Sequence, residues 1–270
     1  MVKCIQFQNQ LIKKKGANKM KIWHFSDSHM LHNRILVPDG IEMAIFSGDC
    51  SNPRDKYSNE QEVLNFIEWY GSLKIPYKIM IAGNHDYFFD YGLKQKNIRH
   101  PWETHPEILV NNMLNKYPNI HYLNDSGVEI DGIKIWGSPV QPWFHDWAFN
   151  RLRNTKHLDS YKEPYVKDKK YIKEHWDLIP ENTDILITHG PPYGHGDLLE
   201  TRFRRGDEDR VGCIDLMNRI KEVKPKVSVF GHIHEGHGVS EDEHTKYINA
   251  SCLNSHYKPV NPPIFIDLDV

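Results

Sequence analysis

The chain has 270 residues, of which 39 % are hydrophobic and 26 % charged, with a formal net charge of -2 at pH 7. This composition is typical of a folded globular protein and excludes a disordered or fibrous chain. The near balance of charge disfavours a non-specific nucleic-acid binder, which needs an excess of Lys and Arg.

The apolar runs and the cysteines indicate the cellular compartment of the protein. No run reaches the ~20 residues that span a bilayer, and none at the start resembles a secretory signal. Four scattered cysteines without a C-x-x-C pair, Cys4, Cys50, Cys213 and Cys252, indicate neither a disulfide framework nor a zinc knuckle. We therefore expect a cytoplasmic protein that keeps its thiols reduced and contacts no membrane.

The first residues differ from the rest of the chain. Residues 1–19 contain three consecutive lysines and no periodic apolar pattern, so we expect a solvated extension there. A chain of this length can bury a sizeable core, which favours one packed domain over residues 20–270.

Within that domain, short apolar runs alternate with helical patterns. Five runs predict buried strands, at residues 22–25, 44–46, 79–82, 185–187 and 227–230. Four more strands are predicted at residues 128–130, 133–136, 247–249 and 264–268, and Asp131-Gly132 between the first two is a hairpin signal. The pattern predicts an α/β fold in which a mixed β-sheet sandwich is flanked by helices.

Two helices stand out between these strands. One begins at Ser58, which has capping-box spacing with Gln61, and the other covers about residues 212–223. Their apolar residues share one face at helical spacing: Val63, Phe66, Ile67 and Tyr70 in the first, and Cys213, Leu216, Met217 and Ile220 in the second.

Five of the predicted strands end in polar clusters: Asp27-Ser28-His29, Gly48-Asp49, Gly83-Asn84-His85-Asp86, His189-Gly190-Pro191-Pro192 and Gly231-His232-Ile233-His234. Taken singly, each cluster is typical of a turn, and Asn84 or Asp86 could cap a helix that follows. Because the carboxyl ends of strands form the ligand crevice of open α/β sheets, the five loops can converge. The ordered set of Asp, His and Asn, with glycine beside four of the five clusters where the backbone must approach a metal or phosphate closely, therefore predicts a metal site.

This order of motifs, D-x-H, G-D, G-N-H-D, H and G-H-x-H, resembles the calcineurin-like metallophosphoesterase superfamily. Longer stretches at residues 137–144, 188–197 and 230–235 resemble its metallophosphoesterase-domain-containing (MPPED) branch, which is similar to class III cyclic-nucleotide phosphodiesterases. The similarity covers nearly all of residues 20–270. It implies the calcineurin-like metallophosphoesterase fold.

The resemblance also implies a dinuclear centre whose ligands can be assigned motif by motif. It assigns Asp27, His29 and His234 to one metal, Asn84, His189 and His232 to the other, and Asp49 to a bridge between them. The expected cofactors are two divalent metal ions per chain, with manganese or iron (Fe2+/Fe3+) favoured and zinc as an alternative. His85 has no ligand role in this assignment, so we expect it to stabilise the transition state or to protonate the leaving alkoxide; an orienting or packing role is the alternative.

The substrate pocket is less well defined by the sequence. Residues 142–150 are rich in aromatic side chains, and we consider Trp143 and Phe144 from this segment, and His195 between two glycines, as substrate-binding candidates. A packed aromatic cluster under a long loop explains residues 142–150 at least as well. The nearby basic residues Arg202, Arg204 and Arg205 are nearly cancelled by Asp207, Glu208 and Asp209, so we interpret that run as a solvated loop.

For this branch, the resemblance implies a phosphodiesterase that hydrolyses small phosphodiesters such as cyclic nucleotides through metal-activated hydroxide. A phosphomonoesterase or a nuclease on the same site is an alternative, and so is a catalytically silent metal-binding scaffold. We expect a small phosphodiester as the substrate and no membrane or nucleic-acid partner. The sequence leaves the oligomeric state open.

Overall fold

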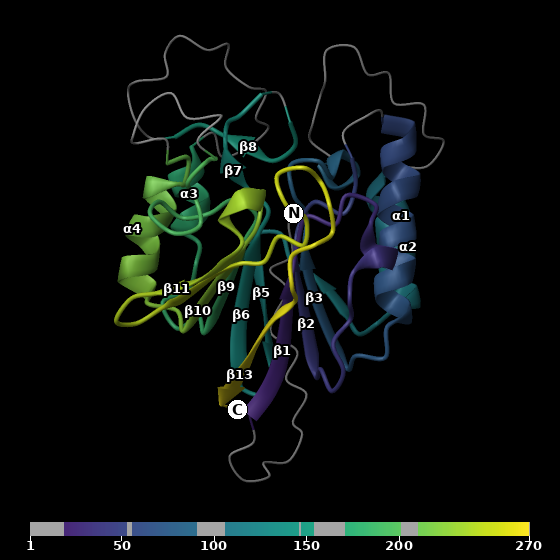
Figure 1. Ribbon diagram of the computed structural model, residues 1–270, viewed down its shortest axis with the longest axis horizontal. Coiled ribbons are helices and arrows are strands. Elements are labelled where there is room, and N and C mark those ends of the chain that lie inside the picture. The colour runs from purple at the N-terminus through teal and green to yellow at the C-terminus, as the bar shows by residue number, and fades with distance from the viewer. Residues whose placement is uncertain are drawn as a thin grey trace, which may run out of the picture.

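The structure is a computed structural model that describes residues 19–52, 56–90, 106–145, 147–153, 171–200 and 210–269. Two β-sheets pack face to face, and helices cover the outer face of each sheet (Figure 1). The predicted α/β sandwich is therefore confirmed. Within the described ranges, no helix has the length and apolar character needed to cross a membrane. Residues 1–18, which contain nearly all of the expected extension, lie outside the described residues.

The first sheet has five strands, four of them parallel. In sheet order they are β13 (Ile264–Asp269), β1 (Lys19–Phe25), β2 (Met43–Ser47), β3 (Tyr77–Ile81) and β4 (Ile120–Tyr122). Only β13 runs antiparallel to its neighbour, β1. Every residue of β2 is buried, because both faces of this sheet are covered.

The second sheet has six strands, of which the inner four are parallel. In sheet order they are β11 (Gly238–Glu241), β12 (Lys246–Asn249), β10 (Val227–Phe230), β9 (Ile185–Thr188), β6 (Ile133–Ser138) and β5 (Ser126–Ile130). The hairpin between β5 and β6 is confirmed, with Asp131 and Gly132 both at positive φ. Two short strands, β7 (Gln141–Pro142) and β8 (Asn150–Arg151), form a separate pair.

Helices α1 (Lys56–Ser72) and α2 (Pro106–Lys116) cover the first sheet, and α3 (Ile172–Trp176) and α4 (Ile214–Val223) cover the second (Figure 1). The described residues also include the short 3-10 turns η1 (His32–Arg34), η2 (Tyr87–Phe89) and η5 (His234–Gly236). Both predicted helical faces are buried as expected. The predicted capping box is wrong, because α1 already begins at Lys56 and a capping residue must lie outside the helix, whereas Ser58 lies within it.

The core lies between the two sheets and under the helices. Alternation along β1 sends Ile22 toward the space between the sheets, while Trp23 and Phe25 pack under α1. Ile22 belongs to the same buried cluster as Ile187 and Ile248 of the other sheet. Each fully buried side chain of this kind contributes roughly 1.5–3 kcal/mol, so this interface fixes how the two sheets sit on one another.

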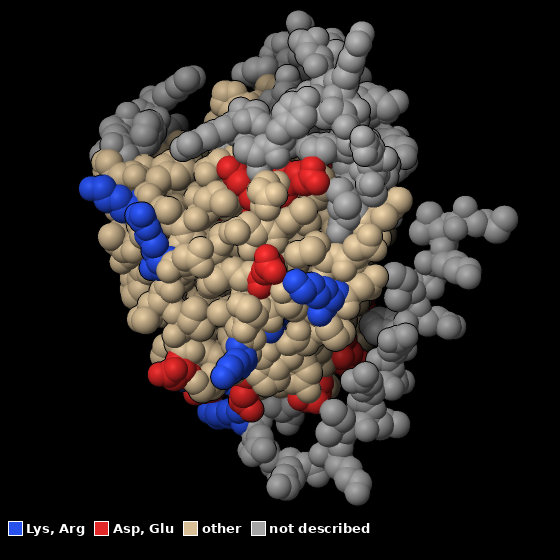
Figure 2. Space-filling model, turned by 90° about the vertical axis from the view of Figure 1, so that its right-hand side faces the viewer, with Lys and Arg blue, Asp and Glu red and all other residues tan. Residues whose placement is uncertain are grey.

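The shape of the sandwich brings distant loops to one end. The parallel strands β1, β2 and β3 of one sheet and β9 and β10 of the other end at the same edge, where Asp27 lies beside His234. On the face over α1 and α2, by contrast, basic and acidic side chains are interspersed, as Figure 2 shows. The shared edge is therefore the candidate functional site.

Candidate dinuclear metal centre

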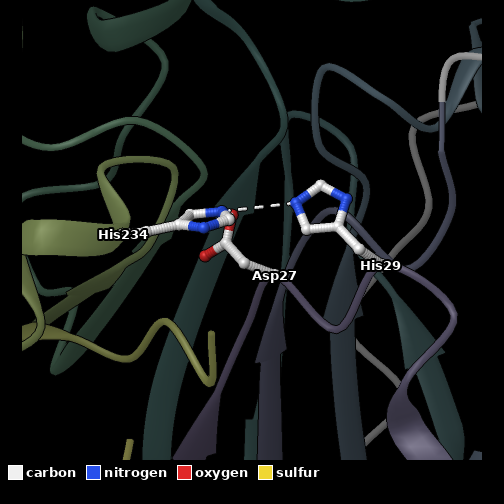
Figure 3. Close-up of side chains that lie close together, drawn as sticks. All are labelled: Asp27, His29 and His234. Carbon is white, nitrogen blue, oxygen red and sulfur yellow. Dashed lines mark hydrogen bonds and ion pairs between the residues drawn. The ribbon is translucent and has the colours of Figure 1, made fainter. Parts of the chain in front are cut away.

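The first group of converging side chains is Asp27, His29 and His234, which we call the His29 group (Figure 3). The His234 Nε2 atom lies 3.5 Å from Asp27 Oδ1 and 3.3 Å from His29 Nε2. All three side chains are buried, and each offers a ligand atom within 4.8 Å of the others. The structure thus brings together the three residues assigned to one metal.

The second group contains Asp49, Asn84, His189 and His232, and we call it the His189 group. The His189 Nε2 atom lies 3.3 Å from Asp49 Oδ2 and 2.7 Å from Asn84 Oδ1. The rings of His189 and His232 are 5.0 Å apart between centroids. The residues assigned to the second metal therefore also lie together.

Asp49 lies between the two groups. Its Oδ2 atom is 3.8 Å from His29 Nε2 and 3.3 Å from His189 Nε2. One carboxylate thus faces nitrogen atoms of both groups, which is the placement that a bridging ligand needs. Two cations close together repel each other, and a shared anionic ligand reduces that repulsion.

The orientation of the imidazole rings tests whether these residues fit metal ions. The Nδ1 atoms of His29, His189 and His234 each lie 2.9–3.1 Å from a backbone carbonyl oxygen. A carbonyl can only accept, so each Nδ1 carries a proton and each Nε2 faces the site, where the Nε2 lone pair of a neutral ring can bind a metal ion. The Nε2 atoms of His29 and His234 lie 3.3 Å apart, where two bare lone pairs would repel each other and a proton or a metal ion between them removes that repulsion. The residues present therefore fit a pair of divalent cations, and carboxylate, amide and imidazole ligands suit Mn2+, Fe2+ and Zn2+.

The site keeps its negative charges. Burial raises the pKa of Asp27, but the hydrogen bond and charge of His234 outweigh burial and lower that pKa to about 2. Burial lowers the pKa of His29 to about 4 and that of His232 to about 3. Burial also acts on His189, but the charge of Asp49 outweighs it and raises the pKa to about 9. Buried carboxylates of this kind require compensating positive charge.

The glycines of the motifs make room for the ligand side chains. A Cβ atom at Gly83 would collide with the Asp49 carboxylate, and one at Gly231 would collide with the Asp27 carboxylate. The sequence suggested that these glycines let the backbone approach a metal or phosphate. In the structure, glycine is required at these positions because the carboxylates of Asp49 and Asp27 pack directly against the backbone.

Several of the assigned ligands have left-handed backbone conformations. The φ angles of Asp27, Asp49 and His232 are +52°, +62° and +67°. Such conformations are uncommon for residues other than glycine and occur where the surrounding structure compensates their cost, typically at functional sites. They turn the side chains back into the site directly after each strand ends.

Asp86, which the sequence suggested as a possible helix cap, neither caps η2 nor hydrogen-bonds His85 Nδ1 within the described residues. Its carboxylate accepts from the backbone amides of Gly83, Asp49 and Ser51 and from the Ser51 hydroxyl. It makes no capping bond to η2, and the His85 Nδ1 atom has no partner among the described residues. Asp86 instead ties the Gly48-Asp49 loop to the loop that carries Asn84.

His85 lies at the rim of both groups. Its Nε2 atom is 3.9 Å from Asp49 Oδ2, and its ring lies 4.8 Å from that of His29. His85, His29 and Asp49 offer ligand atoms close enough to form a metal site of their own. Distances alone are thus compatible with a catalytic role and with a ligand role, and the catalytic role stays a prediction.

A cavity of about 540 Å³ opens beside this centre. Its described lining residues are His29, Leu31, Asn52, His85, Trp147, Leu253 and Tyr257. Trp147 and Tyr257 were not singled out in the sequence, and only the aromatic richness of residues 142–150 pointed toward Trp147.

The three predicted substrate residues are not among the described residues that line this cavity. Phe144 packs edge-on against Trp147 with ring centroids 5.5 Å apart, and Trp143 is in the same loop. His195 stacks on Tyr247 and contacts Ser240, so its ring is engaged outside the cavity lining. The run from Arg202 to Asp209 lies outside the described residues.

Comparisons with known proteins agree with this geometry. A family model described as calcineurin-like phosphoesterase matches residues 20–236. Metallophosphoesterase domain-containing protein 1 is 40 % identical over 250 residues in Homo sapiens and likewise in Mus musculus, covering 90 % of this chain and 69 % of those proteins. The crystal structure of phosphopantetheinyl hydrolase from Mycobacterium tuberculosis has a TM-score of 0.54 at 14 % identity, over 92 % of this chain and 96 % of that one. That likeness shows the shared fold.

The family match and the two converging groups point the same way. Calcineurin-like phosphoesterases use a dinuclear divalent metal centre, and the His29 and His189 groups provide the ligands for one. The chain belongs to the calcineurin-like phosphoesterase family, in its MPPED-like branch, and is a metal-dependent phosphoesterase.

Proposed function

We propose that the chain is a phosphodiesterase that hydrolyses small phosphodiesters such as cyclic nucleotides. The observation that carries this proposal is the cavity of about 540 Å³ beside His29 and His85. A phosphodiester carries a second ester substituent that a monoester lacks, and this substituent needs space next to the phosphate. The cavity volume falls within the ~300–1,000 Å³ of ordinary small-molecule sites.

The two groups of ligands define where the phosphate binds. When bound, two divalent cations supply a strongly nucleophilic water at neutral pH and neutralise the charge that grows on the phosphate oxygens. Asp49 holds the two halves of the site together through its position between His29 and His189. The carbonyl partners of the imidazole rings fix the ring orientations before substrate binds, which lowers the reorganisation cost of the reaction.

His85 supplies the acid in this proposal. It is 6 % exposed, lines the cavity, and directs Nε2 to the side of Asp49. From there it can donate a proton to the leaving alkoxide oxygen or a hydrogen bond to the phosphate. Such general-acid catalysis contributes roughly 10²–10⁴-fold to the rate.

A rate panel on the metal-reconstituted protein tests the function. The substrates are 2′,3′- and 3′,5′-cyclic nucleotides, bis(p-nitrophenyl) phosphate, p-nitrophenyl phosphate as the monoester, and single-stranded DNA. We expect the small diesters to have the highest kcat/KM, with Mn2+ or Fe2+ giving more activity than Zn2+. Faster hydrolysis of the monoester would favour a phosphomonoesterase, and faster hydrolysis of DNA a nuclease. A protein that binds two Mn2+ ions and hydrolyses none of these compounds would be a metal-binding scaffold.

A further inference from the structure

We propose that Trp147 and Tyr257 form two aromatic walls that hold an uncharged planar substituent of the substrate, so that the site prefers aryl or nucleobase diesters to alkyl diesters. This inference rests on the proposed phosphodiesterase function and adds the residues that select the substituent. It concerns the organic part of the substrate and not the metal centre.

The aromatic rings of the cavity form a continuous row. The ring of Trp147 lies 4.7 Å from that of His85, His85 lies 4.8 Å from His29, and His29 lies 5.0 Å from Tyr257. Two imidazoles at the metal centre are thus flanked by an indole at one end and a phenol at the other. A planar group attached to a phosphate at the centre and extending into the cavity lies between these two rings.

Tyr257 is held in place by the loop that also orients a candidate metal ligand. The Asn254 carbonyl accepts from the Tyr257 backbone amide at 2.8 Å and lies 3.1 Å from His234 Nδ1. Asn261 closes the base of this loop by donating to the carbonyls of Ser251 and Leu253. Tyr257 has a φ of +57° and remains 51 % exposed, so the loop keeps a large ring in an open position at a backbone cost.

Trp147 is tied to the opposite side of the centre. The backbone amide of the next residue, Ala148, donates to the carbonyl of Asn84 at 3.1 Å. One residue further on, the Phe149 amide donates to the Asp90 carboxylate at 2.9 Å. Trp147 is therefore anchored to the loop that carries Asn84 and His85, and both walls are positioned before a substrate arrives.

The chemistry of the lining favours an uncharged group. The described lining residues include two leucines, Leu31 and Leu253, and one amide, Asn52, but no Lys, Arg, Asp or Glu. Planar rings bind such surfaces by stacking, and one stacked ring strengthens binding by roughly five- to a hundredfold. Asn52 adds a polar edge that suits the hydrogen-bonding groups of a nucleobase.

Calorimetry on the metal-loaded protein tests the walls without any turnover. The probes are phenylphosphonate, which has a planar group, and inorganic phosphate, which has none. We expect Trp147→Ala and Tyr257→Ala each to weaken phenylphosphonate binding about tenfold and to change phosphate binding less than twofold. Trp147→Phe keeps a ring and serves as one control. Phe265→Ala removes a half-exposed ring on β13, away from the cavity, and serves as the other.

If an Ala variant binds phenylphosphonate and phosphate more weakly by the same factor, the rings support the metal centre instead of the planar group. If both Ala variants bind phenylphosphonate as tightly as the unsubstituted protein, the rings do not contact it. Either result overturns the proposal. Metal content and thermal unfolding of each variant show whether it is folded. If Trp147→Ala does not fold, phenylphosphonate binding by Tyr257→Ala, at a half-exposed position, tests the proposal by itself.

Kinetics separate this inference from the proposed function. Phenyl p-nitrophenyl phosphate and methyl p-nitrophenyl phosphate share one leaving group and differ only in the group that stays on phosphorus. We expect the ratio of their kcat/KM values to fall about tenfold in the Ala variants, mainly through KM. If the unsubstituted protein hydrolyses neither ester, the phosphodiesterase proposal fails while calorimetry still decides the role of the walls. If it hydrolyses both but the ratio stays the same in every variant, only the walls are disproved.

Discussion

The carboxylate of Asp86 accepts a hydrogen bond from the backbone amide of Asp49 at 2.9 Å. The same oxygen accepts from the Gly83 amide at 2.8 Å, and the other oxygen accepts from the amide and hydroxyl of Ser51. Asp86 is fully buried and thereby joins the loops after β2 and β3. The candidate bridging ligand is thus positioned by a residue that is not itself in either ligand group.

This contact predicts the effect of replacing Asp86 with Asn. An amide has one acceptor oxygen, so its NH2 group would face backbone N–H groups that the carboxylate now binds. We expect Asp86→Asn to weaken metal binding by roughly 10–100-fold, the usual effect of losing a residue that orients ligands. Titration of the metal-free protein with Mn2+ measures this change.

A carboxylate elsewhere in the chain provides the matched control for Asp86. Asp242 accepts from the amides of His244 and Thr245 in a turn beyond β11. We expect Asp242→Asn to leave Mn2+ affinity unchanged. If the two variants have the same affinity, Asp86 does not position the metal ligands.

The place of Asp49 between the two groups predicts a defect in stoichiometry. Asp49→Asn keeps the size of the side chain but removes the charge that reduces repulsion between two cations. We expect the variant to bind one divalent ion tightly and the second at least tenfold more weakly, with loss of hydrolysis. Metal content after dialysis, measured by elemental analysis, checks this result. Two tightly bound ions in the variant would contradict the bridging role.

His85 can be assigned by separating turnover from metal content. If His85 acts on the substrate, His85→Ala retains two metals per chain and lowers kcat by roughly 10²–10⁴-fold, with a changed pH profile. If His85 is a ligand, as its distance to Asp49 and His29 also permits, the variant loses one metal. Parallel substitution of His29 with Ala shows what the loss of a ligand looks like in the same assay.

His24 predicts a dependence of stability on pH. It is 1 % exposed, neither ring nitrogen has a partner among the described residues, and burial lowers its pKa from 6.5 to about 3. Below pH 6.5 the unfolded chain binds a proton that the folded chain does not, so stability falls as the pH drops from 6.5 toward 3. This single group lowers the free energy of unfolding by about 2 kcal/mol at pH 5 relative to pH 8.

Denaturant unfolding of His24→Leu at pH 8 and pH 5 tests this origin of the pH dependence. Because an apolar side chain of similar size leaves no unpaired polar atom, we expect equal or higher stability at pH 8. The loss between the two pH values should shrink by the same 2 kcal/mol or so. His244→Leu, at an exposed histidine, serves as the control and should keep the original pH dependence. An unaltered pH dependence in His24→Leu would show that another group titrates.

Much of the framework followed from local patterns. The apolar runs located every strand that is followed by an assigned metal ligand, because strands covered on both faces are largely apolar. The motif order from Asp27 to His234 also gave the correct family. Helix α2 was missed although Val110, Met113 and Leu114 have helical spacing, and α3, with five residues, is too short to show such a pattern.

The sequence by itself determined the class of the fold, the family and the set of residues that converge, since these depend on residue type and order along the chain. Only the tertiary structure decided that Asp86 joins two loops and that Trp147 and Tyr257, not Trp143, line the cavity. The physical reason is that such contacts arise when two sheets pack together. His29 and His234 meet across 205 residues of chain, and no local preference specifies a contact at that separation.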